Sequence, residues 1–454
     1  MMASKGSLQH DRRQEIRNIV SIGITVVASA STWFFFYYRR QQQKRIRKLE
    51  SRQEPTNFSS AYESLIGNTP LVKLPRLSRI LQRDVYVKME SMNPGGTGKD
   101  RAAWAMLHAA EQEGTLPPPI QEHSHEINHA VTTKAPTYVP QNETEQSYET
   151  AIWQAMRASR TGGLVVEGTS GSTGISLATL CACRGHACLV VLPDDQAYEK
   201  QKILQTLQAH VLIVPNVSIS NPKHYVNIAR RLAQYARNQM NIPAVFVDQF
   251  ENQANVQCHA HVTGREVLAQ CPTLDAFVMS AGTGGTLAGI GTFLRQHRPT
   301  CRIVLVDPPG SALYNKIQYG VAYTTEQQER GLLRHRYDTL AEGIGLDRVT
   351  QNLAYGLECI DEAVRVSDQD AVDMAHWMLQ NEGLWVGSSS AMNVVGAIET
   401  AWKLSPGSRV VTVICDSGSR HLTRFWNRDF ILERGLRWPR DQEKELLPAC
   451  LEHR

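Results

Sequence analysis

The chain has 454 residues, of which 42% are hydrophobic and 20% charged, a composition typical of a globular enzyme large enough for two lobes. Its formal net charge of +4 is small for this length. Much of the positive excess precedes Glu50, so the folded part gives no indication of a nucleic-acid-binding surface.

A tail at residues 1–18 precedes an uncharged run at residues 19–38 that is long enough to cross a bilayer as a helix. The run is too long for a secretory h-region and lacks a convincing cleavage site, and a targeting peptide is the alternative. The sequence therefore predicts a single transmembrane anchor. A basic linker follows at residues 39–57.

The charges on the two sides of this run differ. Only basic charges follow it before Glu50, whereas the preceding side mixes basic and acidic residues. This asymmetry predicts a single-pass protein whose catalytic body faces the cytosol. A moderately apolar anchor with a basic C-terminal flank is typical of the mitochondrial outer membrane. The endoplasmic reticulum and the mitochondrial inner membrane are the alternatives.

Beyond about residue 58, short runs rich in Val, Ile and Leu alternate with amphipathic stretches. The strand-like runs lie at residues 85–90, 164–170, 188–193, 211–215, 244–248, 276–280, 302–307 and 410–415. The helical patterns lie at residues 102–110, 148–160, 172–183, 196–207, 226–238 and 368–381. This alternation predicts an α/β fold with parallel sheets and helices on both faces.

Residues 116–145 interrupt the alternation. They are rich in Pro, His, Thr, Gln and Asn, which predicts a loop insertion exposed to solvent. His123, His125 and His129 lie there without a fourth ligand, so we expect no metal site. The nine cysteines are scattered through apolar segments, which indicates buried thiols and not a disulfide framework.

The stretch NPGGTGKDR, Asn93 to Arg101, puts one lysine between a glycine-rich turn and a helical run. A lysine that is held against a ligand and shielded from water has a lowered pKa and becomes a nucleophile toward aldehydes. Lys99 is therefore the first candidate for a Schiff base.

Two further glycine-rich turns follow strand-like runs, within Leu164 to Gly174 and within Ala276 to Thr286. At such strand-to-helix turns, backbone N–H groups and hydroxyls converge on an anion. Neither turn fits a Walker P-loop or the Rossmann spacing of glycines. A lysine together with two anion cradles is what a phosphorylated aldehyde and an amino-acid carboxylate require.

These motifs together resemble the cysteine synthase family of fold-type II pyridoxal-phosphate enzymes, which includes cystathionine β-synthase. Fungal mitochondrial cysteine synthase-like proteins are the most similar group. The matching motifs, in the family's order, are IGNTPLVKL (Ile66 to Leu74), NPGGTGKDR, EGTSGSTG, QFENQAN (Gln249 to Asn255), AGTGGTLAG, EGIG (Glu342 to Gly345), GSSSA (Gly387 to Ala391) and CDSG (Cys415 to Gly418). They cover nearly everything after about residue 60.

The resemblance implies two lobes within residues 58–454, each with a mainly parallel sheet flanked by helices. The smaller lobe would span about residues 90–245, and the larger would combine residues 58–89 with 246–454. The family resemblance also implies a homodimer.

The resemblance makes Lys99 the lysine that binds the pyridoxal-phosphate aldehyde covalently. The implied cofactor contacts are Lys99, Ser172, Gly282, Thr283, Gly284, Gly285, Thr286 and Ser389. Of these, residues 282–286 would hold the phosphate and Ser389 the pyridine nitrogen. The implied substrate contacts are Thr169, Ser170, Gly171, Thr173, Gln249 and Gly343. Glu342 to Gly345 would close over the site.

The implied reaction is a β-replacement that forms L-cysteine from O-acetylserine, or a related activated serine, and sulfide through an aminoacrylate. A hydroxyl at the pyridine nitrogen cannot keep that nitrogen protonated as a carboxylate would, which favours β-elimination. Lys99 would then move the α-proton. The alternatives are a cysteine desulfhydrase that releases sulfide, pyruvate and ammonia, and a catalytically weak membrane-tethered scaffold.

Three positions depart from the family pattern. Ser172 stands where an asparagine usually contacts the cofactor's 3′-oxygen, and a serine reaches less far. Gly98 stands where valine is common, which is expected to loosen the backbone before Lys99. Ala391 replaces a glycine beside Ser389. These departures bear on efficiency and choice of reaction more than on cofactor binding.

Overall fold

The computed structural model describes residues 62–120, 143–324, 328–330, 333–335, 339–439 and residue 448. The chain divides into two compact units, Met1–Thr56 and Asn57–Arg454, and every described residue belongs to the second. The predicted tail, anchor and linker at residues 1–57 therefore lie outside the described residues, as do His123, His125 and His129. Within the described ranges, no helix combines the length and the apolar character that crossing a bilayer requires.

The strands are β1 (Leu71–Lys73), β2 (Asp84–Met89), β3 (Leu164–Gly168), β4 (Ala187–Pro193), β5 (His210–Val214), β6 (Ala244–Phe246), β7 (Ala276–Ser280), β8 (Arg302–Asp307), β9 (Gln328–Arg330), β10 (Leu333–His335), β11 (Glu362–Arg365) and β12 (Arg409–Ile414). The α-helices are α3 (Pro75–Leu81), α4 (Lys99–Gln112), α5 (Glu143–Met156), α6 (Ser172–Arg184), α7 (Tyr198–Thr206), α8 (Tyr225–Asn238), α9 (Gln253–Cys258), α10 (Gly264–Gln270), α11 (Gly285–His297), α12 (Leu313–Tyr319), α13 (Gln351–Ala354), α14 (Asp368–Glu382), α15 (Ser388–Trp402) and α16 (Arg428–Glu433). Short turns of other helix types are η1 (Glu90–Met92), η2 (His259–Thr263), η3 (Leu357–Cys359) and η4 (Gly418–Arg420), of which η2 is a π-helix.

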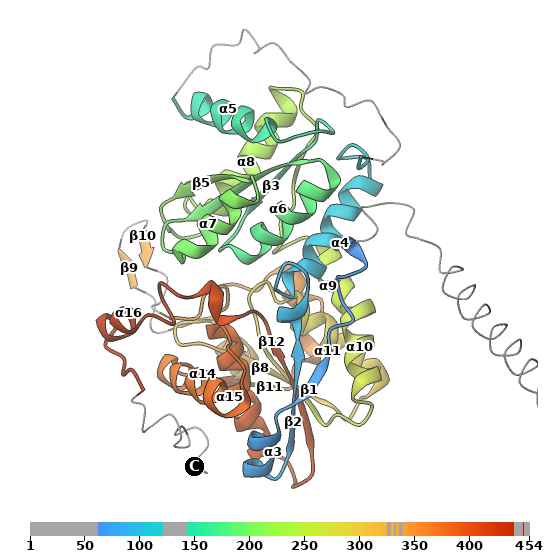
Figure 1. The fold of residues 1–454 in the computed structure, drawn as a ribbon, viewed down its shortest axis with the longest axis vertical. Coiled ribbons are helices and arrows are strands. Elements are labelled where there is room, and N and C mark those ends of the chain that lie inside the picture. The colour runs from blue at the N-terminus through green and yellow to red at the C-terminus, as the bar shows by residue number, and fades with distance from the viewer. Residues whose placement is uncertain are drawn as a thin grey trace, which may run out of the picture. The chain divides into compact units, whose positions relative to one another are not determined.

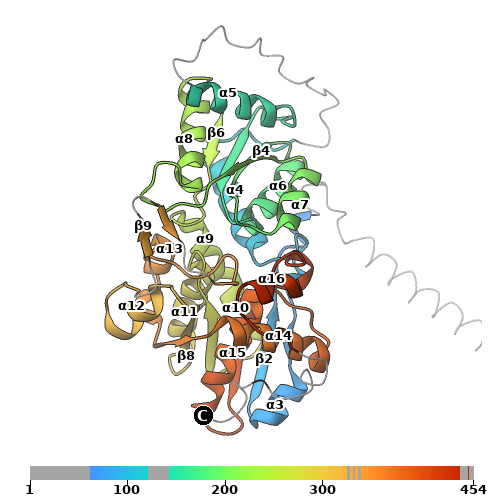
Figure 2. The same cartoon turned by 90° about the vertical axis from the view of Figure 1, so that its left-hand side faces the viewer.

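Two large sheets organise the described residues, and β9 and β10 form a separate two-stranded antiparallel sheet (Figures 1 and 2). The larger has the strand order β1-β2-β12-β7-β8-β11, in which β1 is antiparallel to β2 and the other neighbours are parallel. The smaller has the order β5-β4-β3-β6, with every pair parallel. In Figure 1 the smaller sheet lies in the upper, green part and the larger sheet below it. The predicted α/β architecture is confirmed.

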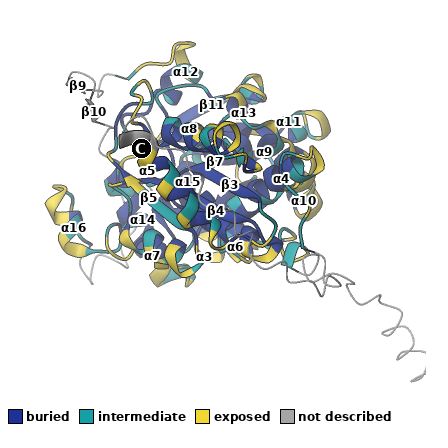
Figure 3. Ribbon diagram, turned by 90° about the horizontal axis from the view of Figure 1, so that it is seen from above, coloured by how far each residue is buried: buried dark blue, intermediate teal, exposed yellow. Residues whose placement is uncertain are grey.

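Helices cover both faces of each sheet, because successive side chains of a strand point to opposite faces. In β3, Leu164 and Val166 pack with residues of α5 and α8, whereas Val165 packs with α4 and α6. In β7, Phe277 packs with α11 and Val278 with α14 and α15. Figure 3 shows the outcome, with the central strands buried and the outer faces of the helices exposed. This double burial explains why the strands appear in the sequence as nearly continuous apolar runs.

Sequence periodicity did not predict every element. The strands β1 and β11 have only three and four residues, too few to show a period. The helix α15 is buried on almost all sides, so it has no polar face to reveal the helical period.

The boundary between the predicted insertion and the next helix was wrong. The insertion was expected to reach residue 145 and the helix to span residues 148–160, but α5 runs from Glu143 to Met156. Polar residues with high helix propensity, such as Glu and Gln, begin this helix. A helix that begins with polar residues gives no apolar signal of its start.

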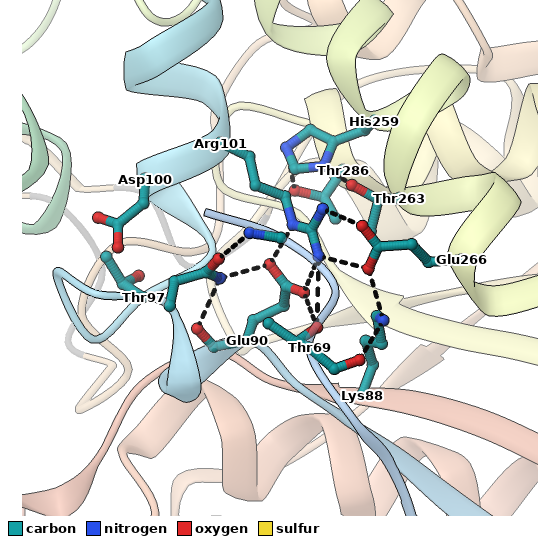
Figure 4. Close-up of polar contacts among 12 residues, drawn as sticks. Thr69, Lys88, Glu90, Thr97, Asp100, Arg101, His259, Thr263, Glu266 and Thr286 are labelled. Carbon is teal, nitrogen blue, oxygen red and sulfur yellow. Dashed lines mark hydrogen bonds and ion pairs between the residues drawn. The ribbon is translucent and has the colours of Figure 1, made fainter. Parts of the chain in front are cut away.

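A buried group of charges joins β2, α4 and α10 (Figure 4). This charge cluster consists of Lys88, Glu90, Arg101 and Glu266. The Arg101 guanidinium donates through Nε to Glu90 (2.8 Å) and through Nη1 to Glu266 (2.7 Å). Lys88 donates to Glu266 (2.7 Å) and to the carbonyl of Thr69 (2.6 Å). Two cations and two carboxylates balance, so the cluster holds the first turn of α4 against the larger sheet without a net buried charge.

The cluster stabilises the ionised form of Glu266. Burial alone would raise the pKa of this carboxyl, but hydrogen bonds and charge attraction from Arg101 and Lys88 lower it to about 2. A carboxyl whose pKa is lower in the folded state than in the unfolded chain adds stability above the unfolded pKa. That stability is lost as the pH falls toward the folded pKa.

We therefore expect Glu266→Gln to lower the free energy of unfolding by about 3 kcal/mol at pH 7, because it leaves Arg101 and Lys88 undercompensated. The difference from wild type should narrow as the pH falls from 4.5, the ordinary value for Glu, toward 2. Thermal unfolding midpoints of both proteins across this pH range measure the effect. The control is Lys73→Gln, which breaks an exposed pair with Asp84 and should cost under about 1 kcal/mol. Equal losses in the two variants would contradict the prediction.

Candidate active site

The carboxyl ends of β3, β7 and β12 open into one cavity, which holds about 970 Å³ of empty space including its mouth. In parallel α/β sheets, ligands bind at this end of the strands. The first turns of α4, α6, α11 and α15 also contribute lining residues. Because the N-terminus of a helix carries partial positive charge and unpaired N–H groups, the cavity suits an anionic ligand.

Lys99 is the first residue of α4 and lines this cavity. The glycine turn before it is fastened by Asp100, which accepts hydrogen bonds from Gly95 N (2.6 Å) and from the Ser176 hydroxyl (2.5 Å). Burial lowers the pKa of the Lys99 amine below its usual value. A larger fraction of the amine is therefore neutral and able to attack a carbonyl.

Gly98 has an ordinary helical backbone, with φ −62° and ψ −13°. Its place before Lys99 therefore does not depend on the conformational freedom of glycine. A Cβ atom here would lie 3.2 Å from Oε2 of Glu90, which is fixed by its hydrogen bonds to Arg101. The charge cluster thus imposes a packing constraint at Gly98, and the loosening of the backbone stays a prediction.

The turn at residues 169–173 separates lining residues from supporting ones. The cavity is lined by Ser170, Ser172 and Thr173, but not by Thr169 or Gly171. Thr169 is buried beneath the turn and accepts a hydrogen bond from Gly171 N (3.1 Å). Thr173 donates to Oε1 of Gln249 (2.5 Å), a further lining residue.

Gly171 is required by its surroundings. Its φ of +127° is one that residues with a side chain rarely adopt. A Cβ atom would also lie 2.5 Å from Cδ of Lys200 on α7. The turn therefore packs directly on the Lys200 side chain.

The second turn, at residues 281–286, forms a cradle at the start of α11. Its lining residues are Gly282, Thr283, Gly284 and Thr286, whereas Gly285 packs toward Asn255. A Cβ atom on Gly282 would collide with the carbonyl of Gly343, so the segment after β10 crosses closely over the cradle. Within the described part of the chain, the Ser280 hydroxyl in this wall is buried without a hydrogen-bond partner.

Of the three serines that begin α15, Ser389 lines the cavity. Ser390 instead accepts a hydrogen bond from Cys415 N (2.9 Å). Cys415 also lines the cavity, and burial raises the pKa of its thiol to about 11, so it is a neutral neighbour of Lys99. Ala391 is fully buried in α15 and does not line the cavity.

Sequence reasoning missed three charged residues of the wall, Glu90, Lys200 and Asp416. Lys200 forms an ion pair with Glu342, and Nε2 of His421 lies 3.1 Å from Asp416. Burial alone would raise the pKa of both carboxyls, but the neighbouring cations lower it. Lys200 gave no signal in the sequence, because nothing marks one lysine on an amphipathic helix as buried.

Pairing compensates each carboxylate among the described residues of the wall. Glu90 pairs with Arg101, Glu342 pairs with both Lys200 and Arg424, and Asp416 lies 3.1 Å from Nε2 of His421. The helix N-termini and the Lys99 amine are thus left to interact with a ligand. A phosphorylated aldehyde fits this arrangement. The glycine cradle offers N–H donors, the Ser280 hydroxyl just before the cradle has no hydrogen-bond partner among the described residues, and the Lys99 amine of lowered pKa lines the same cavity.

Comparison with known proteins agrees with this chemistry. The family described as "Pyridoxal-phosphate dependent enzyme" matches residues 62–131 and 147–416. "Cysteine synthase 2" of Schizosaccharomyces pombe is 40% identical over 377 residues, which are 82% of this chain and 85% of that protein. "Putative mitochondrial cysteine synthase" of Saccharomyces cerevisiae is 41% identical over 367 residues, 80% of this chain and 83% of the other.

A solved structure described as O-ureido-L-serine synthase has a similar fold, with a TM-score of 0.62 and 26% sequence identity over 85% of this chain and 97% of that chain. The family match covers well over half of the chain, and relatives of about 40% identity extend over most of it. The chain therefore belongs to the pyridoxal-phosphate dependent enzyme family, in the group of the cysteine synthases.

Proposed function

We propose that this protein forms L-cysteine from O-acetylserine, or a related activated serine, and sulfide. The observation that carries the proposal is that Lys99, the cradle at residues 282–286 and the turn at residues 170–173 line one cavity. Relatives at 40% identity that are named cysteine synthases support this choice within the family.

In this proposal the cofactor is held by Lys99, Ser172, Gly282, Thr283, Gly284, Gly285, Thr286 and Ser389. Bound pyridoxal phosphate supplies an aldehyde that receives the substrate's amine and a ring that withdraws electrons from Cα. The N–H groups and hydroxyls of the cradle bind the phosphate. The Ser389 hydroxyl would donate a hydrogen bond to the unprotonated ring nitrogen.

The substrate's carboxylate would be bound at the start of α6 by Ser170, Thr173 and Gln249, the side chains of the turn that reach the cavity. Thr169 and Gly171 shape this turn from behind. Gly343 lies opposite this turn and completes the substrate site, because a Cβ atom added to it would lie 3.4 Å from Oγ of Ser170. The amine of Lys99 takes the proton from Cα, and its lowered pKa favours the neutral form that acts as the base.

The wall charges favour a substrate whose β-substituent is uncharged before it leaves. Lys99 and Lys200 are the cationic side chains among the described lining residues, and the charge of Lys200 is compensated by Glu342. An acetyl ester on the substrate needs no further cation to balance its charge. A phosphate on the substrate, in addition to the cofactor's phosphate, would need one. This argument supports O-acetylserine over a phosphorylated serine.

We propose further that residues 19–38 anchor the protein in the mitochondrial outer membrane, with the catalytic body in the cytosol. The uncharged run and its basic C-terminal flank support this, and the yeast relative has a mitochondrial name. The endoplasmic reticulum and the mitochondrial inner membrane are the alternatives. A homodimer is proposed on the family resemblance alone.

The role of Lys99 predicts that purified protein has the visible absorbance of bound pyridoxal phosphate and that Lys99→Ala loses it together with activity. The reason is that Ala has no amine for the aldehyde. Absorbance spectra and turnover of the two proteins measure the effect. Lys202→Ala is the matched control, since Lys202 is an exposed lysine on α7. A wild-type protein that stays colourless with added cofactor would rule the proposal out.

The direction of the reaction predicts a higher kcat/KM for sulfide uptake with O-acetylserine than for sulfide release from cysteine. The compensated wall suits the neutral acetyl ester, and acetate is a better leaving group than sulfide. Parallel assays of sulfide consumption and sulfide production on one preparation decide the matter. Faster release from cysteine would identify a desulfhydrase instead.

The pairing of Lys200 with Glu342 predicts that Glu342→Gln raises the ratio of kcat/KM for O-phosphoserine to that for O-acetylserine by about tenfold, because Lys200 keeps an uncompensated charge. Adding Lys200→Gln should lower the ratio toward its wild-type value, although Arg424, the second partner of Glu342, still lacks its carboxylate. The control is Glu362→Gln, which breaks a Lys–Glu pair with Lys403, and neither of these residues lines the cavity. An unchanged ratio in Glu342→Gln would contradict the prediction.

A further inference from the structure

A buried line of polar side chains ends at the phosphate cradle. The hydroxyl of Thr263 lies 3.0 Å from Nδ1 of His259, and Nε2 of the same ring lies 3.2 Å from the hydroxyl of Thr286 (Figure 4). His259 and Thr263 are almost completely buried, whereas Thr286 lines the cavity. Nothing in the reaction outlined above uses the imidazole of His259.

The fold brings this line together at a local irregularity. His259 and Thr263 begin and end the π-helical turn η2, which lies between α9 and α10. Single π-helical turns are rare and occur often at functional sites. At Gly289 the helix α11 packs so closely on this turn that a Cβ atom would lie 2.8 Å from Cβ of His259. The close approach brings the imidazole within reach of the first turn of α11.

The surroundings keep His259 uncharged. Burial lowers the pKa of the imidazole well below its usual value, and the nearby cations Arg101 and Lys99 lower it further. Glu266 opposes this effect, but it is engaged by Arg101. A neutral imidazole has one nitrogen that donates and one that accepts. The line of three groups therefore has a direction.

Two directions are possible. In the first, Thr263 donates to Nδ1, the N–H of Nε2 donates to Thr286, and the hydroxyl hydrogen of Thr286 is free to donate into the cradle. In the reverse direction Thr286 donates to the imidazole and presents only lone pairs to the cradle. An anion in the cradle is attracted by the first arrangement and repelled by the second.

We propose that His259 is a positioning residue that, as the Nε2–H tautomer, holds the Thr286 hydroxyl in the orientation that donates to the cofactor phosphate. The proposal rests on the assignment of residues 282–286 to that phosphate. His259 itself touches neither cofactor nor substrate. It acts by deciding which way a neighbouring hydroxyl points.

The test compares the dissociation constants of pyridoxal phosphate and pyridoxal, measured by absorbance with each apoprotein. Pyridoxal keeps the aldehyde for Lys99 but lacks the phosphate. We expect His259→Leu to raise the dissociation constant of pyridoxal phosphate about tenfold, because one charge-assisted hydrogen bond is lost. The dissociation constant of pyridoxal should stay unchanged. His259→Gln places an amide N–H where Nε2 was and should bind within about threefold of wild type.

Two further measurements separate positioning from a general structural role. The ³¹P resonance of the bound phosphate should shift in His259→Leu and keep its wild-type position in His259→Gln. Thr286→Val should weaken the binding of pyridoxal phosphate as much as His259→Leu does. The double variant should lose no more affinity than either single variant, because both changes remove the same hydrogen bond.

Several results would overturn the proposal. If His259→Leu weakens the binding of pyridoxal and of pyridoxal phosphate equally, His259 has a general structural role. If the losses of affinity add up in the double variant, His259 and Thr286 act independently. If His259→Leu does not fold, His259→Asn replaces it, since its shorter amide does not reach Thr286; Asn and Gln variants that bind alike would overturn the proposal. A wild-type protein that binds both compounds equally would instead refute the assignment of the cradle.

Discussion

The buried ion pairs of Arg101 are the interaction on which the site depends. They join α4 to α10 and to η1, which directly follows β2, so that the helix beginning at Lys99 is fixed to the larger sheet while its apolar face packs on the smaller one. A buried guanidinium with two carboxylates is stable only when its partners keep their geometry. Lys99 is thereby held at a place where two sheets meet, and burial there lowers the pKa of its amine.

The same principle extends over the cavity wall. Each lining carboxylate among the described residues has a basic side chain as its partner, and these contacts leave Lys99 and four helix N-termini to interact with a ligand. Compensation of this kind lets charged residues remain in a partly dry cavity without competing for the ligand's anions. An anionic ligand is therefore attracted to Lys99 and the helix N-termini, and not to the charged side chains that are already paired.

Close approaches of the backbone shape the cavity as much as its charges do. Gly171 accommodates Lys200, Gly282 accommodates the carbonyl of Gly343, and Gly289 admits the π-helical turn that contains His259. At each place a Cβ atom would meet a neighbour from a distant part of the chain. Such glycines bring segments within reach of one another that longer side chains would hold apart.

The sequence by itself determined the alternation of strands and helices, the family, Lys99 as the candidate nucleophile, and the two anion cradles. These depend on apolar periodicity and on glycine turns beside strands, which are local patterns. Only the tertiary structure placed Thr169 and Gly171 behind the lining of the cavity, added Glu90, Lys200 and Asp416 to the wall, and gave Gly98 a packing reason. It also connected His259 to Thr286, 27 residues away in the chain. Burial, pairing of charges and close packing arise between segments far apart in sequence, so no local pattern contains them.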